Sequence, residues 1–482
     1  MSRINTNVSS LVAVNALEKN TGSLQTSLQR LSTGVRINSG KDDPSGLIAS
    51  ESLKAEQKAT ETAVSNAQQA NSIIGTAEGS LSEVSNLLVS LQGLVGNSAN
   101  SAGLSDDEKN ANQLQVDSIL STINRISNSS SFQGVKLLNG TFDYTTSGLT
   151  TTSAFTSISI NSAKVQNSTL SVDVTVVTSA KTGELDFAGS STGLNGNATI
   201  SVAGNQGTIQ LSFASSTSSS KIVSSVNQFT DSTGVKAILS SDNKSIQFIS
   251  TGYGTSQFVS VQSSNSTAVS TTDRSGVATT SSSGTNATLT VNGTTAVSDG
   301  LHVKAVFGDL LDVDFTLNAA ANSNGVSKTF GITGGGATFS LGAQVNTANT
   351  ASVGIGSVNT ASIGKYVQNG SIYSLADLGS GKAAAVNTGD TTLAQNIVTQ
   401  AIKDVSNLRG RLGAFQANTL SSTINSLNVA LENVSSSESA ITDTDFATET
   451  ANLTRSQILV QSATSVLSQA NQSPQAVLKL LG

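Results

Sequence analysis

Apolar residues recur at helical spacing in both ends of the chain and at strand spacing in its middle. The clearest helical pattern lies in the N-terminal region, where steps of four and three residues alternate without a break. The seam consists of Ala63, Ala67, Ala70, Ile74, Ala77, Leu81, Val84, Leu88, Leu91 and Val95. Such spacing is typical of a coiled coil, and as a helix the seam would be about 50 Å long. Because glycines within it lower the helix propensity, we expect packing to hold this helix.

Two capping patterns predict where N-terminal helices begin. Asp43 followed by Pro44 has the arrangement of an N-cap and a first helical residue. Ser105 and Glu108 have the spacing of a capping box. The second helix would present an apolar face of Val116, Leu120, Ile123 and Ile126.

Similar stripes occupy the C-terminal region. The first contains Ile397, Ala401, Val405, Leu408, Leu412 and Phe415 and continues, after a small register shift, with Leu420, Ile424, Leu427, Leu431 and Val434. The last contains Leu459, Ala463, Val466, Ala470, Val477 and Leu481. Proline is favoured in the first turn of a helix, so Pro474 predicts the start of a final short helix. Because long stripes occur at both ends, we expect the two arms to pair as a long antiparallel coiled-coil rod.

The extreme N-terminus carries a narrower stripe without aromatic residues. It contains Ile4, Val8, Leu11, Leu24, Leu28, Leu31 and Val35. Burial of so narrow a face within one chain could not offset the entropy of ordering, which costs roughly 1–2 kcal/mol per residue. We therefore expect this segment, and similarly the last stripe, to be disordered in the monomer and to fold against partners.

The middle of the chain is rich in Ser, Thr, Gly and Asn and contains most of the aromatic residues. Short alternating patterns predict strands at 169–176, 208–213, 245–250 and 287–291, and a helix at 219–229. Regularly spaced Val, Ile and Phe supply core material. The chain is thus expected to be of the α+β class, with a strand-rich, surface-exposed outer insert between helical ends.

Composition excludes several functional classes. Charged residues make up 12% of the chain and the net charge is −6, which argues against a basic face for nucleic acid. No apolar run approaches the roughly 20 residues that a membrane-spanning helix needs. The absence of cysteine excludes disulfides, zinc–thiolate sites and cysteine nucleophiles.

Candidate catalytic groups are few, and no enzyme activity or cofactor is expected. The one histidine, His302, is followed by Val303 and cannot form an H-E-x-x-H zinc site; we expect it on a strand surface. The stretch "GSGK" at 379–382 lacks residues of a phosphate-binding loop and is expected to be an ordinary loop. Scattered acidic residues are interpreted as helix caps and solvated positions: Glu432, Glu438, Asp443, Asp445 and Glu449.

Long motifs at both ends resemble the bacterial flagellin family. At the N-terminal end they are "INTNVSSLVAVNAL", "LQRLSTGVRINSGKDDPSGLIAS" and "FQGVKLLNG". At the C-terminal end they are "VSNLRGRLGAFQ" and "DTDFATETANLTRSQILVQSATSVLSQANQSPQAVLKLLG". The resemblance implies a secreted structural subunit that polymerises into the flagellar filament for swimming motility.

The resemblance also implies a division into three parts. Residues 1–43 and 443–482 would form terminal filament-core helices. Residues 44–143 and 336–442 would form a helical inner domain with a small β-hairpin that starts at "FSLGA" (339–343). Residues 144–335 would form the outer insert.

The polymerisation interface would be built from the terminal stripes. The expected interface residues are Ile4, Val8, Leu11, Leu24, Leu28, Leu31, Val35, Leu459, Val466, Val477 and Leu481. The expected partners are copies of the chain itself, the flagellar export apparatus, a C-terminal-binding export chaperone, and filament cap and junction proteins, without nucleic acid or membrane insertion. The first residues lack the layout of a cleaved signal peptide, so we expect export to the extracellular filament by another route.

Charged residues surround the expected joint between core and inner domain. They are Arg30, Arg36, Lys41, Asp42 and Asp43. Two interpretations stay open: ion pairs that set subunit register, or a solvated loop with a capping aspartate.

One stretch departs from the family pattern. Flagellins recognised by a Toll-like innate receptor carry "QRVREL" in the inner helix, where this chain has "VSLQGL" at 89–94. Leu94 is kept, but Ser90 and Gln92 replace arginines and Gln115 replaces a partner glutamate. Since serine and glutamine cannot supply the charge-assisted bonds of arginine, we expect only weak binding to that host receptor.

Two alternatives to a plain filament subunit remain. A hook–filament junction protein has similar ends, although the long C-terminal match argues against it. A filament whose outer insert acts as an adhesin would also fit the low charge and the many hydroxyl groups.

Overall fold

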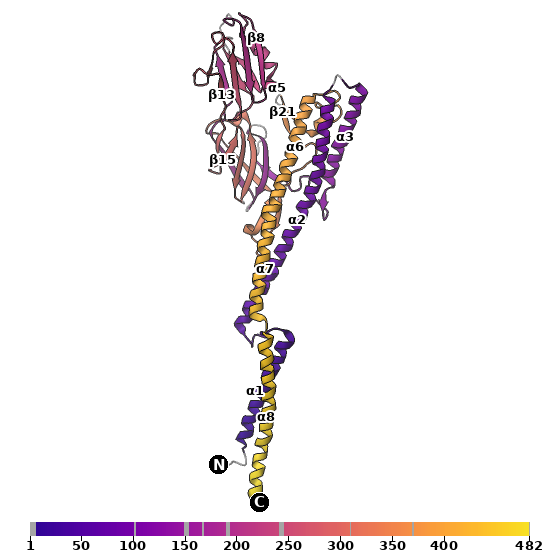
Figure 1. The fold of residues 1–482 in the computed structure, drawn as a ribbon, viewed down its shortest axis with the longest axis vertical. Helices are drawn as coiled ribbons and strands as arrows, with labels where there is room; N and C mark the ends of the chain where they lie inside the picture. Colours follow the sequence, from indigo (N-terminus) through magenta and orange to yellow (C-terminus); the bar gives the residue numbers. More distant parts are fainter. Residues whose placement is uncertain are drawn as a thin grey trace. The chain divides into compact units, whose positions relative to one another are not determined.

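Helices form both ends of the chain and strands dominate its middle, as Figure 1 shows. This computed structural model describes residues 6–100, 103–148, 154–165, 168–188, 193–240, 245–308, 310–368 and 371–481, and only the backbone of 473–481. The chain divides into two compact units. The first contains Met1–Gln69, Ser340–Asn349 and Leu420–Gly482, and the second contains Ala70–Phe339 and Thr350–Thr419. The expected combination of helical ends and a strand-rich middle is confirmed.

Two terminal helices pair in the first unit. Helix α1 (Val8–Thr33) and helix α8 (Phe446–Leu481) lie side by side, with both chain ends at the same end of the pair (Figure 1). Asn20 contacts Leu459 while Arg30 contacts Glu449, so the two helices run antiparallel. Helix α1 ends at Gly34, which has a φ of 75° and donates its N–H to Arg30 O.

The long helix α2 (Pro44–Ser98) carries the predicted apolar seam. Asp43 Oδ1 accepts the N–H of Gly46 at 2.9 Å, which confirms Asp43 as the cap. Every seam position is buried: Ala63, Ala67, Ala70, Ile74, Ala77, Leu81, Val84, Leu88, Leu91 and Val95. The predicted face of this helix is therefore confirmed as core.

Helix α3 (Asp106–Ser129) begins with the predicted capping box between Ser105 and Glu108. Its apolar face buries Val116, Leu120 and Ile123, whereas Ile126 is half-buried. Two short pairs flank the insert: β1 (Ser131–Phe132) with β2 (Val135–Lys136), and β19 (Ala337–Ser340) with β20 (Thr350–Val353). The second pair contains the start of the hairpin expected at "FSLGA".

An irregular connector lies against α3 and α6. It contains β21 (Tyr366–Gln368), β22 (Ser371–Tyr373) and the 3₁₀ turn Leu375–Leu378. The buried Gln113 donates to Leu378 O and accepts from Val386 N, at 2.9 and 2.8 Å. Asp117 accepts from the N–H and hydroxyl of Ser380. The "GSGK" stretch is thus confirmed as a loop, and it docks on α3.

The C-terminal helices explain the register shift seen in the sequence. Helix α6 (Thr391–Ala414), capped by Asp390, continues through a π-helical turn (Phe415–Leu420) into α7 (Ser421–Thr442). A π-helical turn adds about one residue to a helical turn. This extra residue accommodates the five-residue step from Phe415 to Leu420 in the apolar stripe.

The expected helix start at Pro474 is wrong. Helix α8 continues without interruption from Phe446 to Leu481. Proline has a φ compatible with an α-helix, so a helix can continue through it with the loss of one backbone hydrogen bond.

The insert contains two β-sheet cores. Among the described residues, one sheet has the order β3 (Tyr144–Ser147), β18 (Ser327–Gly335), β5 (Leu170–Thr178), β14 (Thr288–Val291), β15 (Thr294–Asp299), β16 (His302–Phe307), β17 (Leu311–Leu317) and β4 (Phe155–Ala163). Its core is centred on Phe315 and Phe330, which both meet Phe155 edge to face. Aromatic pairs of this kind contribute about 0.5–1.5 kcal/mol of stability beyond that of their buried area.

The second core lies between two smaller sheets. One has the order β12 (Thr271–Asp273), β6 (Glu184–Phe187), β10 (Ile246–Ser250) and β9 (Val235–Leu239). The other has the order β13 (Ser281–Ser283), β11 (Phe258–Ser263), β7 (Ala198–Gly204) and β8 (Thr208–Phe213). Helix α4 (Ser219–Asn227) packs Ile222 and Val226 into this core, and the short α5 (Thr230–Thr233) follows it. The predicted strands and the predicted helix are therefore confirmed to within two residues at each end.

The first and last strands of the insert pair with each other. Tyr144 of β3 lies opposite Gly335 of β18. Gly335 has a φ of 92°, and a Cβ there would lie 2.1 Å from Asp143 O, so a side chain is excluded. The chain therefore leaves and rejoins the helical part at neighbouring points.

Candidate assembly surface

Large apolar side chains of α1 face away from α8. Val8, Leu11 and Leu28 are 62%, 65% and 49% exposed, whereas Leu24, Leu31 and Val35 are half-buried. Within α1 the buried residues are Ala13 and Ser27, both small. The pairing with α8 therefore covers only part of the stripe.

Helix α8 shows the same arrangement. Leu459 and Val466 are 44% and 58% exposed, while the small Ala463 and Ala470 are buried. Ile4 lies outside the described residues, and Val477 and Leu481 lie in α8 at positions whose side chains are outside the described part.

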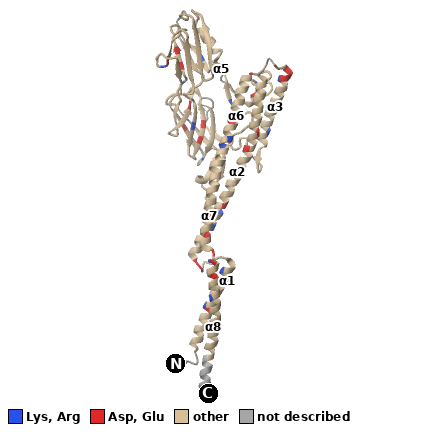
Figure 2. Ribbon diagram, in the orientation of Figure 1, with Lys and Arg blue, Asp and Glu red and all other residues tan. Residues whose placement is uncertain are grey.

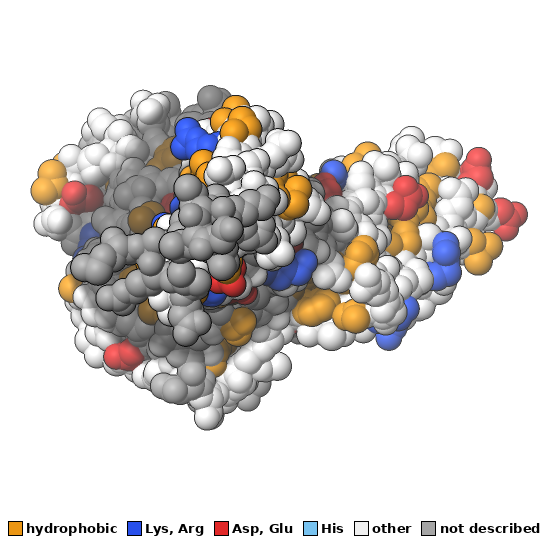
Figure 3. All heavy atoms as spheres, turned by 90° about the horizontal axis from the view of Figure 1, so that it is seen from below, with side chains coloured by type: hydrophobic (Ala, Val, Ile, Leu, Met, Phe, Trp, Pro, Cys, Tyr) orange, Lys and Arg blue, Asp and Glu red, His pale blue; other side chains and the backbone are white. Residues whose placement is uncertain are grey.

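Sequence spacing missed several exposed apolar residues. Val12, Phe446 and Ile458 are each more than half exposed. Val12 and Ile458 are the sequence neighbours of Leu11 and Leu459. Including the apolar residue next to each stripe position would therefore have identified them from the sequence. On the face shown in Figure 3, hydrophobic side chains reach the surface in separate groups with polar and charged ones between them.

The joint between the terminal pair and the next helices is closed by backbone hydrogen bonds. Arg36 N–H donates to Thr442 O at 2.6 Å, and Thr444 N–H donates to Gly34 O at 2.9 Å. Val35 and Asp443 form an antiparallel bridge between them. The two loops that connect α1 to α2 and α7 to α8 are therefore held together.

Charged residues gather at this joint, as Figure 2 shows. Arg30 Nη1 lies 3.6 Å from Glu449 Oε2, and the Glu449 side chain is buried. Arg36 Nη2 donates to Ile441 O at 2.7 Å. Each arginine thus joins the two arms within one chain, Arg30 through an ion pair and Arg36 through a backbone carbonyl.

The neighbouring residues fit the second interpretation. A hydrogen bond from the Ser39 hydroxyl lowers the pKa of Asp42, and the Gly46 N–H lowers the pKa of Asp43. Both carboxylates thus cap local backbone, while Lys41 is exposed. At the other arm Asp445 accepts the N–H groups of Ala447 and Thr448, so it caps α8 as expected.

The stretch that matches the receptor motif lies on exposed helix surface. Ser90 on α2 and Gln115 on α3 are exposed, and Gln92 and Leu94 are half-buried. The Ser90 hydroxyl donates to Asn86 O, one turn back in its own helix. Two apolar neighbours, Val89 and Leu114, are 57% and 70% exposed.

Arg411 joins α6 to the large sheet of the insert within the second unit. Its guanidinium donates to Asn161 of β4 and to Gly354 O, the latter at 3.0 Å. Burial lowers the pKa of Arg411. A fixed cation at this position ties the helix to the sheet and to the segment that follows β20.

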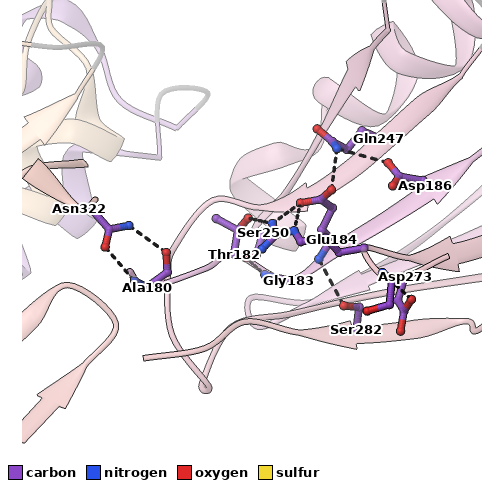
Figure 4. Close-up of polar contacts among 12 residues, drawn as sticks. Ala180, Thr182, Gly183, Glu184, Asp186, Gln247, Ser250, Asp273, Ser282 and Asn322 are labelled. Atoms are coloured by element: carbon purple, nitrogen blue, oxygen red, sulfur yellow. Dashed lines mark hydrogen bonds and ion pairs between the residues drawn. The ribbon is translucent and has the colours of Figure 1, made fainter. Parts of the chain in front are cut away.

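Polar contacts hold the segment that leads from β5 into β6, between the first core of the insert and the second (Figure 4). Asn322 accepts from the N–H of Ala180 and donates to its carbonyl, at 2.7 and 2.8 Å. Gln247 donates to Glu184 at 2.7 Å and to Asp186 at 3.3 Å, and Arg274 pairs with Glu184. Desolvation raises the pKa of Asp186. These acidic groups are occupied by partners within the chain.

The one histidine of the chain lies on the surface of the large sheet. His302 begins β16, and its Nε2 lies 2.7 Å from Asp314 Oδ1 at the surface, as expected for a strand position. The hydrogen bond to Asp314 raises the pKa of His302. Within the described ranges, no group of three or more metal-ligating His, Cys, Asp or Glu side chains occurs, and no helix is long and apolar enough to cross a membrane.

Comparison with known proteins agrees with these features. Residues 4–143 match the bacterial flagellin N-terminal helical region, and residues 395–481 match the C-terminal helical region. The chain is 32% identical to flagellin D of Vibrio anguillarum and 30% identical to a flagellin of Salmonella typhimurium. Each alignment covers 99% of this chain and 99% of the relative.

Solved flagellar proteins are also similar at low identity. FliC from Burkholderia pseudomallei is 18% identical, with 72% of this chain and 98% of that chain covered and a TM-score of 0.23. A flagellar cap protein fragment from Escherichia coli is 17% identical, with 38% and 98% covered and a TM-score of 0.26. The identification rests on the full-length relatives and on the two matched helical regions. The chain belongs to the bacterial flagellin family and is a structural subunit of the flagellar filament.

Proposed function

We propose that α1 and α8 fold as the filament forms, because their apolar stripes are completed only by neighbouring subunits. The observation that carries this proposal is the exposure of Val8, Leu11 and Leu28 beside a pair that buries mainly small residues. Each large apolar side chain contributes about 1.5–3 kcal/mol when it is fully buried. The proposed interface comprises Ile4, Val8, Leu11, Leu24, Leu28, Leu31, Val35, Leu459, Val466, Val477 and Leu481.

The proposed domain division follows the joints of the chain. Residues 1–43 and 443–482 would form the filament core, and the hydrogen-bonded loops around Val35 and Asp443 support this boundary. Residues 44–143 and 336–442 would form the inner domain, whose helices we propose to pair as an antiparallel coiled-coil rod. Residues 144–335 would form the outer insert, a boundary supported by the pairing of Tyr144 with Gly335.

A filament subunit has to bind its neighbours and does not have to catalyse a reaction. Polymerisation is an association reaction, so we propose that the chain has neither a catalytic site nor a cofactor. Its partners would be other copies, the export apparatus with a chaperone for the C-terminal segment, and the cap and junction proteins of the same filament.

We further propose that this flagellin is a weak ligand of the host Toll-like receptor. The exposed positions Ser90 and Gln115 lack the charge that the receptor-binding motif supplies. A receptor reporter assay with the purified chain should show low potency compared with a flagellin that carries "QRVREL". Full potency would contradict the proposal.

The folding proposal is tested by hydrogen exchange on monomer and filament. The amides of Val8–Thr33 and of Phe446 onward should exchange rapidly in the free monomer and become protected in filaments verified by electron microscopy. The seam of α2 should be protected in both states. Strong protection of α1 in the monomer would contradict folding on assembly.

Matched variants separate assembly from monomer stability. Leu28→Ser removes an exposed apolar side chain of α1, and Gln29→Ser changes its exposed polar neighbour. We expect the critical concentration for polymerisation to rise on the order of tenfold in the first variant and to stay within twofold in the second. Equal critical concentrations for the two variants would show that Leu28 does not belong to the interface.

A further inference from the structure

Pro474 leaves one carbonyl of α8 without its usual donor. In an α-helix each N–H donates to the carbonyl four residues earlier, and proline has no N–H. Helix α8 nevertheless continues from Phe446 to Leu481 through this residue. The carbonyl that loses its helical partner is that of Ala470, a residue that is only 9% exposed.

The side chain of Asn7 supplies a replacement donor. Asn7 Nδ2 donates to Ala470 O at 2.8 Å across the α1–α8 pair. The other atom of the same amide, Oδ1, accepts the N–H of Ser10 at 3.0 Å and caps α1. Beside this contact the Ser10 hydroxyl donates to Asn471 Oδ1 at 2.8 Å. The Asn7 amide thus pairs a free N–H at the start of α1 and the carbonyl of α8 that Pro474 leaves without a donor.

We propose that Asn7 and Pro474 form a register lock between the terminal helices. Carbonyls one turn away in α8, such as that of Val466, already accept a helical N–H, so they attract a further donor less strongly. A slip of one turn, about 5.4 Å, would leave Ala470 O unpaired and Asn7 Nδ2 without its acceptor. The proline therefore distinguishes one carbonyl from all its neighbours.

The helix pair needs such a device because its apolar contacts specify register poorly. The buried residues at this interface include Ala13, Ala463 and Ala470, which are small and similar in shape. A polar contact within a helix interface is an established way to fix register, and this one acts at the end of the pair away from the Arg30–Glu449 contact. The lock acts where α1 and α8 are paired, so it rests on the proposed folding of these helices in the filament.

The test is a double-mutant cycle on full-length subunits polymerised from seeds. Asn7→Asp keeps the capping oxygen but removes the amide donor, and Asn7→Ser does the same without adding charge. Pro474→Ala restores an N–H that can donate to Ala470 O. The matched control is Asn20→Asp, because Asn20 Nδ2 reaches Leu459 O, at 3.5 Å, where the helix already supplies a donor.

We expect Asn7→Asp and Asn7→Ser to raise the critical concentration on the order of tenfold. Asn20→Asp should change it less than twofold. In the Pro474→Ala background, the effect of either Asn7 substitution should also fall below twofold, because the acceptor is then satisfied within α8. This loss of effect would not occur if Asn7 acted only as a helix cap.

Two results would overturn the lock. One is an Asn7→Ser variant that polymerises like Asn20→Asp; the other is an undiminished effect of the Asn7 substitutions when residue 474 is alanine. If Pro474→Ala itself fails to polymerise, the comparison of Asn7→Ser with Asn20→Asp decides whether the Asn7 donor contributes to assembly. Wild-type filaments that are insensitive to Asn7 would refute the lock alone, whereas a wild-type chain that forms no filaments would refute the assembly role itself.

Discussion

The seam of α2 and the stripe of α1 have similar helical spacing but opposite burial. Every seam position from Ala63 to Val95 is buried, whereas Val8, Leu11 and Leu28 are largely exposed. Periodicity therefore predicts which face of a helix will pack. It does not reveal whether the partner lies in the same chain, and the burial in a single subunit supplies that information.

The largest expected contrast concerns the stability of the monomer. Leu81→Ala removes a fully buried seam side chain and should lower the free energy of unfolding by about 3 kcal/mol. Leu28→Ala should change it by less than about 0.5 kcal/mol, since Leu28 is exposed in the subunit. Denaturant unfolding of the monomer measures both values. A comparable loss in the two variants would abolish the distinction between seam and stripe.

A smaller effect is expected at the joint between the terminal pair and α2. Glu449→Gln weakens the ion pair with Arg30 and should destabilise filaments by about 1 kcal/mol, because Arg30 stays partly exposed. The temperature at which filaments dissociate should fall. Glu432→Gln, which alters an exposed carboxylate on α7, serves as the control. Equal shifts would show that the pair contributes nothing specific.

The smallest effect is a pH dependence confined to the insert. His302 is the one histidine of the chain, and its pKa is raised above 6.5 by Asp314. A raised pKa in the folded state gives stabilisation that is complete below about pH 6.5 and is lost as the pH rises through the folded-state pKa. Since the side chain is 53% exposed, the change should be well below 1 kcal/mol.

Thermal unfolding of the insert followed from pH 6 to pH 9 tests this expectation. The decrease in stability should be absent in His302→Gln. If His302→Gln kept the pH profile of the wild type, the pH dependence of the insert's stability would come from another titratable group.

Local signals predicted most of the helices. The capping residues Asp43 and Ser105 and the seam of α2 needed only short-range spacing, and the step from Phe415 to Leu420 marked the π-helical turn. Pro474 misled because proline at a helix start and proline within a helix share the same local preference for φ. The helix that runs unbroken from Phe446 to Leu481 distinguishes the two cases.

Non-local features could not be predicted from spacing. The sheet order that places β18 between β3 and β5 joins segments far apart in the chain. The docking of the connector on Gln113 and Asp117 depends on polar residues that look solvated in the sequence. The apolar stripes of the assembly surface were recognised, but the fraction of each side chain left exposed depends on how α8 covers α1.

The pairing of Tyr144 with Gly335 has a consequence for how such a chain can diversify. Because both ends of the insert lie on adjacent strands, the chain leaves and re-enters the helical part at one place, whatever the length of the insert. A shorter, longer or foreign domain whose termini are equally close could replace it without altering the spacing of the helices. The same helical ends could then carry unrelated domains in place of the insert.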